Sequence, residues 1–126
     1  MRDVTSGQSI KGTIRYMILA VLSFLNLDKF KDIQSDIELS GTPVCEGIVS
    51  GIARVAKTLE EASLTQPGEI LITRYTDIGW SPIFPIINGL VTEIGGLLSH
   101  GSVVAREYGL PCIIAVADAT DIFHTV

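Results

Sequence analysis

The chain has little cysteine, little positive charge and few charged residues of either sign. Cys45 and Cys112 are its two cysteines in 126 residues. This is too few for a disulfide framework and predicts reduced, buried thiols in a cytoplasmic protein. Lysine and arginine total 9 against 14 acidic residues, a net charge of −5. No basic surface for nucleic acid is therefore expected. With 47% hydrophobic and 18% charged residues, the composition suits one packed core.

The sequence also lacks the glycine-rich motifs that bind nucleotides, whether the phosphate loop ending in Lys-Ser/Thr or the dinucleotide fingerprint. It has no run of basic residues that would clamp a triphosphate with magnesium. A metal site built from Cys45, Cys112, His100 and His124 would match no common zinc spacing. We therefore predict no metal and no cofactor bound by this chain.

The longest hydrophobic stretch is too short for a membrane span. Residues 16–22 are continuously apolar, and Ser23 and Asn26 interrupt the continuation, whereas a spanning helix needs about 20 apolar residues. Lys11 and Arg15 precede the stretch, so a signal peptide or anchor is the alternative, but no small-x-small cleavage site follows. We interpret residues 12–27 as an ordinary hydrophobic helix and residues 28–40 as a polar connector, with no membrane partner.

Strands and short helices alternate after residue 41, which predicts a layered α/β domain over residues 41–126. A strand is predicted within residues 43–56, from the alternating pattern at 49–55, and further strands at 69–73, 90–92 and 112–116. A helix capped by Thr58 and a turn at Gln66-Pro67-Gly68 separate the first two strands. Residues 75–88 form a loop with a helical turn near 81–84, and residues 119–123 form a last helical turn.

One short helix combines a glycine turn, a cap, a histidine and a stop. Ser99 is the predicted N-cap, whose hydroxyl would accept a backbone N–H of the first turn. Gly109 suits the left-handed residue beyond a helix, and a proline two residues later ends it. His100 therefore lies in the first turn, where free N–H groups and the positive helix end gather. Gly95 and Gly96 leave room for an anion beside it, and a neutral imidazole is a nucleophile.

The segment GGLLSHGSVVAREYGLP, residues 95–111, resembles the active-site segment of the phosphohistidine, or swivelling, domain of phosphoenolpyruvate-utilising enzymes. Residues 75–96, YTDIGWSPIFPIINGLVTEIGG, are similar to the subgroup of phosphoenolpyruvate synthase-like proteins and rifampicin phosphotransferase. The resemblance covers roughly residues 41–120. It implies a compact β/β/α swivelling domain in which His100 accepts a phosphoryl group from a nucleotide- or phosphoenolpyruvate-derived donor and passes it to a small acceptor such as pyruvate.

The resemblance also implies partners, because such a domain is one part of a phosphotransferase and not a complete enzyme. ATP and magnesium are expected on a separate ATP-grasp-type domain, and the acceptor on a further domain. Relatives usually continue into another β-hairpin where this sequence ends at Val126, so the domain is either truncated or rebuilt there. Exposed sheet edges would favour a homo-oligomer, and the alternative function is a non-catalytic interaction module. Leu98 stands where several branches carry threonine, so the regulation of one branch does not transfer.

The residues around His100 have two interpretations each. Ser99 and Ser102, with Gly95, Gly96 and Gly101 near them, surround a phosphate, or the serines are a cap and a small packing residue. Thr92 and Glu93 orient the imidazole or are structural. Arg106 lies on another helix face and makes a surface ion pair or docks a partner domain. In the second segment Tyr75, Thr76, Asp77 and Trp80 match the family, with the aspartate as a turn former and the tryptophan in the core.

Overall fold

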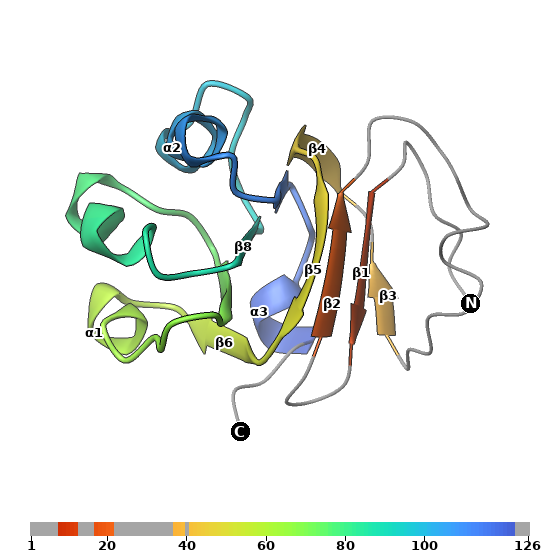
Figure 1. Cartoon of the computed structure of the whole chain (residues 1–126), viewed down its shortest axis with the longest axis horizontal. Coiled ribbons are helices and arrows are strands. Elements are labelled where there is room, and N and C mark those ends of the chain that lie inside the picture. The colour runs from red at the N-terminus through yellow and green to blue at the C-terminus, as the bar shows by residue number, and fades with distance from the viewer. Residues whose placement is uncertain (1–7, 13–16, 22–36, 40, 123–126) are drawn as a thin grey trace.

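The computed structural model describes residues 8–12, 17–21, 37–39 and 41–122, which form two β-sheets and one layer of helices (Figure 1). The four-stranded sheet has the order β3-β1-β2-β5 and is antiparallel throughout. Its strands are β1 (Gln8–Gly12), β2 (Met17–Val21), β3 (Ile37–Leu39) and β5 (Gly47–Gly51).

The second sheet has five strands in the order β4-β9-β8-β7-β6. Strands β6, β7, β8 and β9 are parallel, and β4 joins the edge antiparallel to β9. Their bounds are β4 (Thr42–Cys45), β6 (Ala53–Ala56), β7 (Ile70–Thr73), β8 (Gly89–Thr92) and β9 (Cys112–Ile114). Because neighbouring parallel strands end at the same edge, the loops that follow β7 and β8 begin side by side.

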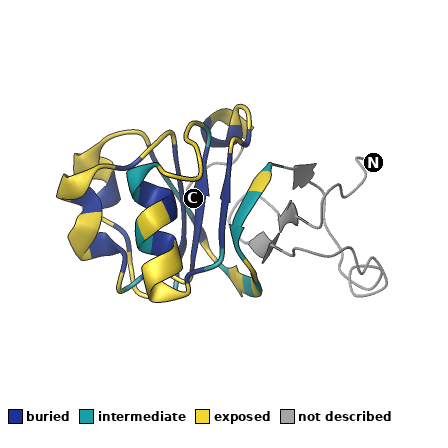
Figure 2. Cartoon of the chain, turned by 90° about the horizontal axis from the view of Figure 1, so that it is seen from above, coloured by how far each residue is buried: buried dark blue, intermediate teal, exposed yellow. Residues whose placement is uncertain are grey.

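The five-stranded sheet is buried on both faces, as its continuous apolar strands predict. Ile70, Ile72, Val91 and Ile113 pack toward the four-stranded sheet, where Val49 of β5 contacts them. The alternate residues of the same strands, Leu71, Leu90, Cys112 and Ile114, join a second cluster with the helices. Figure 2 shows the buried strands between the more exposed outer elements. The predicted β/β/α order of layers is confirmed.

The helical layer holds three elements that follow strands of the five-stranded sheet. These are α1 (Leu59–Ala62), the 3₁₀ helix η2 (Ile78–Ile83) and α2 (His100–Tyr108). A further short helix outside this set, α3 (Ala119–Ile122), follows β9. Thr58 caps α1 as predicted, because its hydroxyl accepts the Glu61 N–H at 3.1 Å. Three further predictions are also confirmed, namely the turn at residues 66–68, the buried strand predicted at 69–73 and the helical turn within residues 75–88.

The predicted helix over residues 12–27 is wrong in its described part, which forms strand β2 and the last residue of β1. A short apolar run does not distinguish a strand from a buried helix by periodicity alone. Pairing decided it here: β2 runs antiparallel to β1 on one side and to β5 on the other, with Leu19 opposite Val49. Residues 13–16 and 22–27 lie outside the described residues, as does the connector except for 37–39, which is strand β3.

The stretch in which the sequence predicts one strand, residues 43–56, contributes to three strands, because the chain changes sheets twice. Strands β4 and β6 belong to the five-stranded sheet, and β5 between them belongs to the four-stranded one. Side-chain alternation continues through such a crossing and therefore does not reveal it. Gly51 makes the second crossing possible, since a Cβ there would lie 2.7 Å from the Gly68 carbonyl oxygen. The predicted boundary near residue 41 thus has paired strands on either side of it.

In the part of the chain that the structure describes, no helix is both long and apolar enough to cross a bilayer.

Candidate functional site

His100 is the first residue of α2, directly after the N-cap residue Ser99. The helix ends as predicted at Gly109, which has φ 65° and whose N–H bonds back to the last turn. The predicted cap hydrogen bond is wrong. Within the described residues the Ser99 hydroxyl accepts no backbone N–H of the first turn, and it donates instead to the Gly96 carbonyl at 2.8 Å. The first-turn N–H groups, which have no acceptor inside a helix, therefore receive no side-chain cap from Ser99.

The two ring nitrogens of His100 have different neighbours. The Thr76 hydroxyl lies 3.0 Å from Nδ1, and the Ser81 hydroxyl lies 3.5 Å from Nε2. Thr76 is 8% exposed, whereas Ser81 is exposed. The Phe84 ring meets the imidazole edge to face, with centroids 5.7 Å apart and planes at 88°. The Nδ1 side of the imidazole thus has the closer and more buried hydroxyl partner, and the Nε2 side has the longer contact to an exposed one.

The segment that follows β7 brings Thr76 to the imidazole. Asp77 begins η2 by accepting the Gly79 N–H at 2.9 Å, the predicted turn-forming role. Trp80 is buried in the core, also as predicted. Gly101 completes the contact from the α2 side, because a Cβ there would lie 2.9 Å from the Thr76 hydroxyl oxygen. The close approach of α2 and this segment therefore requires glycine at position 101.

The glycine turn before α2 is held by serine hydroxyls. Ser99 and Ser102 both donate to the Gly96 carbonyl at 2.8 Å, and their oxygens are 3.1 Å apart. These contacts support the structural interpretation of both serines, and their predicted contact with phosphate stays a prediction. Gly95 has φ 140°, a backbone conformation that favours glycine. A Cβ on Gly96 would meet no described atom within 4 Å.

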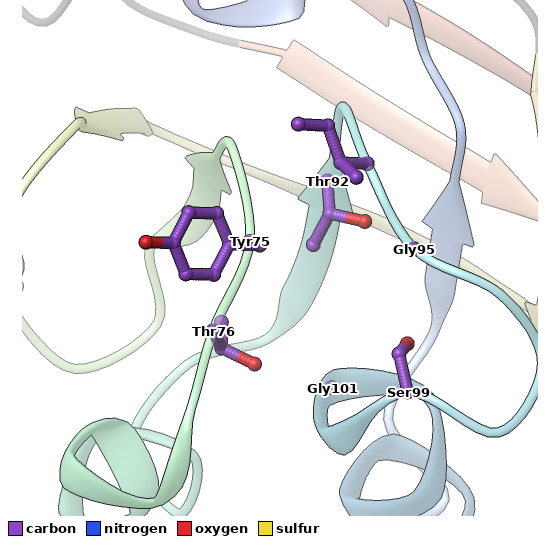
Figure 3. A pocket seen from close by; sticks show the side chains of 7 residues that line it. Tyr75, Thr76, Thr92, Gly95, Ser99 and Gly101 are labelled. Carbon is purple, nitrogen blue, oxygen red and sulfur yellow. The ribbon is translucent and has the colours of Figure 1, made fainter.

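A cavity of about 280 Å³ lies beside α2, between the loops that leave β7 and β8 (Figure 3). It is lined by Tyr75, Thr76, Thr92, Ile94, Gly95, Ser99 and Gly101. Figure 3 shows the hydroxyl oxygens of Thr76, Thr92 and Ser99 turned toward the space that these loops enclose. Three residues of the predicted phosphate environment thus line one cavity, together with the residue that holds Nδ1.

The predicted supporting residues lie in three different places. Thr92 lines the cavity and is 3% exposed. Glu93 points elsewhere: its carboxylate accepts both the N–H and the hydroxyl of Thr120, at 2.7 and 2.5 Å, so it holds α3, the structural alternative. Arg106 donates to the Leu97 carbonyl at 2.5 Å and so contacts the glycine-turn loop. The sequence predicted for it a surface ion pair or the docking of a partner domain.

Cys45, Cys112 and Leu98 are not among the described hydrogen-bond and ring partners of His100. Cys45 and Cys112 are free thiols that face each other across β4 and β9. Burial is the main cause that raises the pKa of Cys112 to about 12, and burial also raises the pKa of Cys45. Leu98 is 89% exposed, and His124 lies outside the described residues. Among the described residues, no three histidine, cysteine or acidic side chains gather closely enough to hold a metal ion.

Sequence reasoning missed three neighbours of the imidazole, namely Thr76, Ser81 and Phe84. All three lie in the segment over residues 75–96 that carries the family resemblance. The available signal was that this segment leaves a buried strand next to the one that leads to His100. That signal predicts proximity at one sheet edge, but it does not say which side chain reaches the ring.

Known proteins resemble this part of the chain. Residues 65–125 match the family described as PEP-utilising enzyme, mobile domain. This segment belongs to that mobile-domain family. A rifampicin phosphotransferase of Bacillus cereus is 55% identical over 80 residues, 64% of this chain and 9% of the relative. One of Streptomyces sviceus is 51% identical over 90 residues, 71% of this chain and 10% of the relative.

The similarity extends to a phosphoenolpyruvate synthase of Aeropyrum pernix, which is 36% identical over 88 residues, 69% of this chain and 11% of the relative. The suspected subgroup is therefore confirmed, with both kinds of named relative present. The chain spans about a tenth of the length of these relatives. The mobile-domain match includes η2, β8, the glycine turn and α2, and hence the whole surroundings of His100.

Proposed function

We propose that this chain is a phosphocarrier in which Nε2 of His100 accepts a phosphoryl group and passes it to a small-molecule acceptor. The 3.0 Å contact between the Thr76 hydroxyl and Nδ1 carries the proposal. A ring nitrogen that keeps its proton in a hydrogen bond fixes the tautomer and leaves the lone pair on the other nitrogen. Nε2, with its longer contact to exposed Ser81, is then the nucleophile.

The first transfer forms a bond between Nε2 and phosphorus and breaks the bond from phosphorus to the leaving oxygen of the donor. The electron pair of that bond stays on the leaving oxygen, and Nδ1 keeps its proton against Thr76. In the second transfer an acceptor oxygen, which loses its proton to water or to a base outside this domain, attacks phosphorus, and the electron pair of the N–P bond returns to Nε2. The Ser81 hydroxyl is placed to donate to a phosphoryl oxygen on this side of the ring.

The donor and the acceptor are bound outside this domain in the proposal. An ATP-grasp-type domain would bind ATP and magnesium, and a further domain would bind the acceptor, as the family resemblance implies. Support comes from the names of the relatives, which include phosphotransferases with two different names. Pyruvate is one acceptor of suitable chemistry, and other hydroxyl- or enol-bearing small molecules are others.

The test is acid-labile phosphorylation of the chain by ATP and an ATP-grasp-type domain. His100→Asn should abolish the label, because asparagine has no ring nitrogen that could attack phosphorus. His124→Asn is the matched control, since it removes the other of the two histidines, and it should label like the unaltered chain. Label that persists in the His100 variant, or that resists acid, would refute the assignment. A folded chain that no donor domain labels would favour the interaction-module alternative.

A further inference from the structure

The cavity of about 280 Å³ beside α2 presents hydrogen-bond donors that lack acceptors. Thr92 is 3% exposed, and its hydroxyl has no hydrogen-bond partner among the described residues. A buried hydroxyl without a partner is unfavourable and calls for a group that is not part of the chain. Figure 3 shows this oxygen turned toward Gly95 and away from the strand.

Thr76 supplies a second donor to the same cavity. If Nδ1 of His100 keeps its proton, the Thr76 oxygen accepts that proton at 3.0 Å. The hydroxyl proton of Thr76 must then point to a different acceptor. No other partner of the Thr76 hydroxyl is present among the described residues, and Thr76 lines the cavity. With Nδ1 protonated, the Thr76 hydroxyl is therefore available as a donor to an acceptor inside the cavity.

The start of α2 adds backbone donors on the same side. Gly101 lines the cavity, and it belongs to a helix of nine residues whose first-turn N–H groups have no intrahelical acceptor. The positive end of the helix favours negative charge at this point. The carboxylate of Glu93, which follows the cavity-lining Thr92, is turned to Thr120 and so does not fill this role.

We propose that this cavity binds a phosphate-type oxyanion, held by the hydroxyls of Thr76 and Thr92 and by the N-terminus of α2. The site is separate from Nε2 of His100, because the cavity lining includes Thr76, which contacts Nδ1, but does not include His100. An anion there accepts the Thr76 proton, makes the Thr76 oxygen a better acceptor for Nδ1–H, and so favours the tautomer that leaves Nε2 reactive. Occupancy of the cavity would then regulate the carrier.

The rim of the cavity suggests two sources for the oxyanion. Tyr75 and Ile94 line it and are 57% and 54% exposed, so they could contact an organic group attached to phosphorus. The hydroxyls of Thr76 and Thr92 and the N-terminus of α2 would bind the phosphate oxygens of inorganic phosphate and of a phosphomonoester in the same way. Phenyl phosphate is therefore the second probe, and tighter binding of phenyl phosphate than of inorganic phosphate would identify an organic phosphate as the ligand.

The experiment titrates the full chain with inorganic phosphate at constant ionic strength and follows backbone amides by NMR. The expected result is a saturable shift of the Thr92, Gly95 and Gly101 amides. Thr92→Val should weaken binding about tenfold or more, since it removes one hydrogen bond to a charged group. Thr65→Val is the matched control, because Thr65 is 6% exposed, its hydroxyl also lacks a partner among the described residues, and it is outside the cavity lining.

Equal phosphate affinity of the Thr92 and Thr65 variants would overturn the proposal, as would shifts that sodium chloride alone reproduces. The binding step is distinguishable from the proposed phosphocarrier function. His100→Asn should keep phosphate binding at the cavity while it loses phosphorylation. The regulatory step rests on that function and is read separately, from the ¹⁵N shifts of the His100 ring with and without phosphate. Ring shifts that do not change on saturation would refute the regulation.

Discussion

Replacement of Thr76 by valine should slow phosphorylation of His100 without unfolding the domain. Valine has nearly the shape of threonine but cannot accept the Nδ1 proton, so the change removes one interaction at 3.0 Å. The ring would then exchange its Nδ1–H form for the form in which Nε2 carries the proton. The second form has no lone pair at the nitrogen that we propose as the nucleophile.

The size of the effect follows from the hydrogen bond. One such bond is worth about 0.5–1.5 kcal/mol net, and each 1.36 kcal/mol corresponds to about a tenfold change in rate. The rate of Nε2 phosphorylation should therefore fall by about twofold to tenfold. Since His100 is only half-buried, water can reach Nδ1 in the variant, and the free energy of unfolding should fall by less than about 1.5 kcal/mol.

Single-turnover phosphorylation and ¹⁵N NMR of the imidazole measure the two halves of this prediction. Thr76→Ser keeps the hydroxyl and should restore both the rate and the tautomer. Ser81→Ala should change the tautomer less, because its contact with Nε2 is 3.5 Å and exposed. An unchanged tautomer in the valine variant would refute the reasoning, and so would a wild-type ring that carries its proton on Nε2.

Three further changes test the packing that supports the site. Gly101→Ala should push Thr76 off the ring and destabilise the domain by about 1–3 kcal/mol, because the new Cβ would lie 2.9 Å from the Thr76 oxygen; Gly96→Ala, with open space, should do neither. Arg54→Met should lower the free energy of unfolding by about 2–3 kcal/mol, as measured by urea denaturation. Arg54 donates two hydrogen bonds, at 2.8 and 3.1 Å, to the carboxylate of Glu69, which is 6% exposed and would be left without this charged partner. Burial raises the pKa of the Cys112 thiol from 9.0 to about 12. Above pH 9 the thiol therefore ionises in the unfolded chain but not in the folded one, and the free energy of unfolding falls as the pH rises toward 12. Cys112→Ala should lessen this fall when the free energy of unfolding is measured between about pH 7.5 and 10.

The layered fold could be predicted because local signals and burial agree over residues 53–122. Strand β7 is apolar at every position before its last, Thr73, and Gly109 and the proline after it end α2 where the pattern places the end. The N-terminal error has the opposite cause. Residues 17–21 have an apolar run that fits either structure, and their pairing with β1 and β5 decides the outcome. Such long-range pairing leaves no local pattern in the sequence.

The place of His100 at the start of a helix was predictable, and its hydrogen-bond partners were not. His100 follows from a helix start that local residues define, namely Ser99 and the glycines before it. The Thr76 contact joins positions 24 residues apart and depends on how far the chain turns after β7. The cap geometry also escaped prediction. Ser99 could bond forward to the helix or back to the Gly96 carbonyl, and the buried Ser102 hydroxyl, which shares that carbonyl, favours the backward bond.

The arrangement has a consequence for a carrier that visits two different sites. Thr76, Ser81 and the cavity belong to the same packed unit as His100, because β7 and β8 are hydrogen-bonded neighbours and their loops enclose the start of α2. The contact that selects the tautomer therefore accompanies the imidazole wherever the domain docks. A nucleophile prepared in this way does not depend on the donor or the acceptor domain for its proton arrangement. The isolated chain should thus already favour the Nδ1–H tautomer, which phosphate in the cavity would populate further, and a ring that adopts this tautomer only on addition of a donor domain would contradict this reasoning.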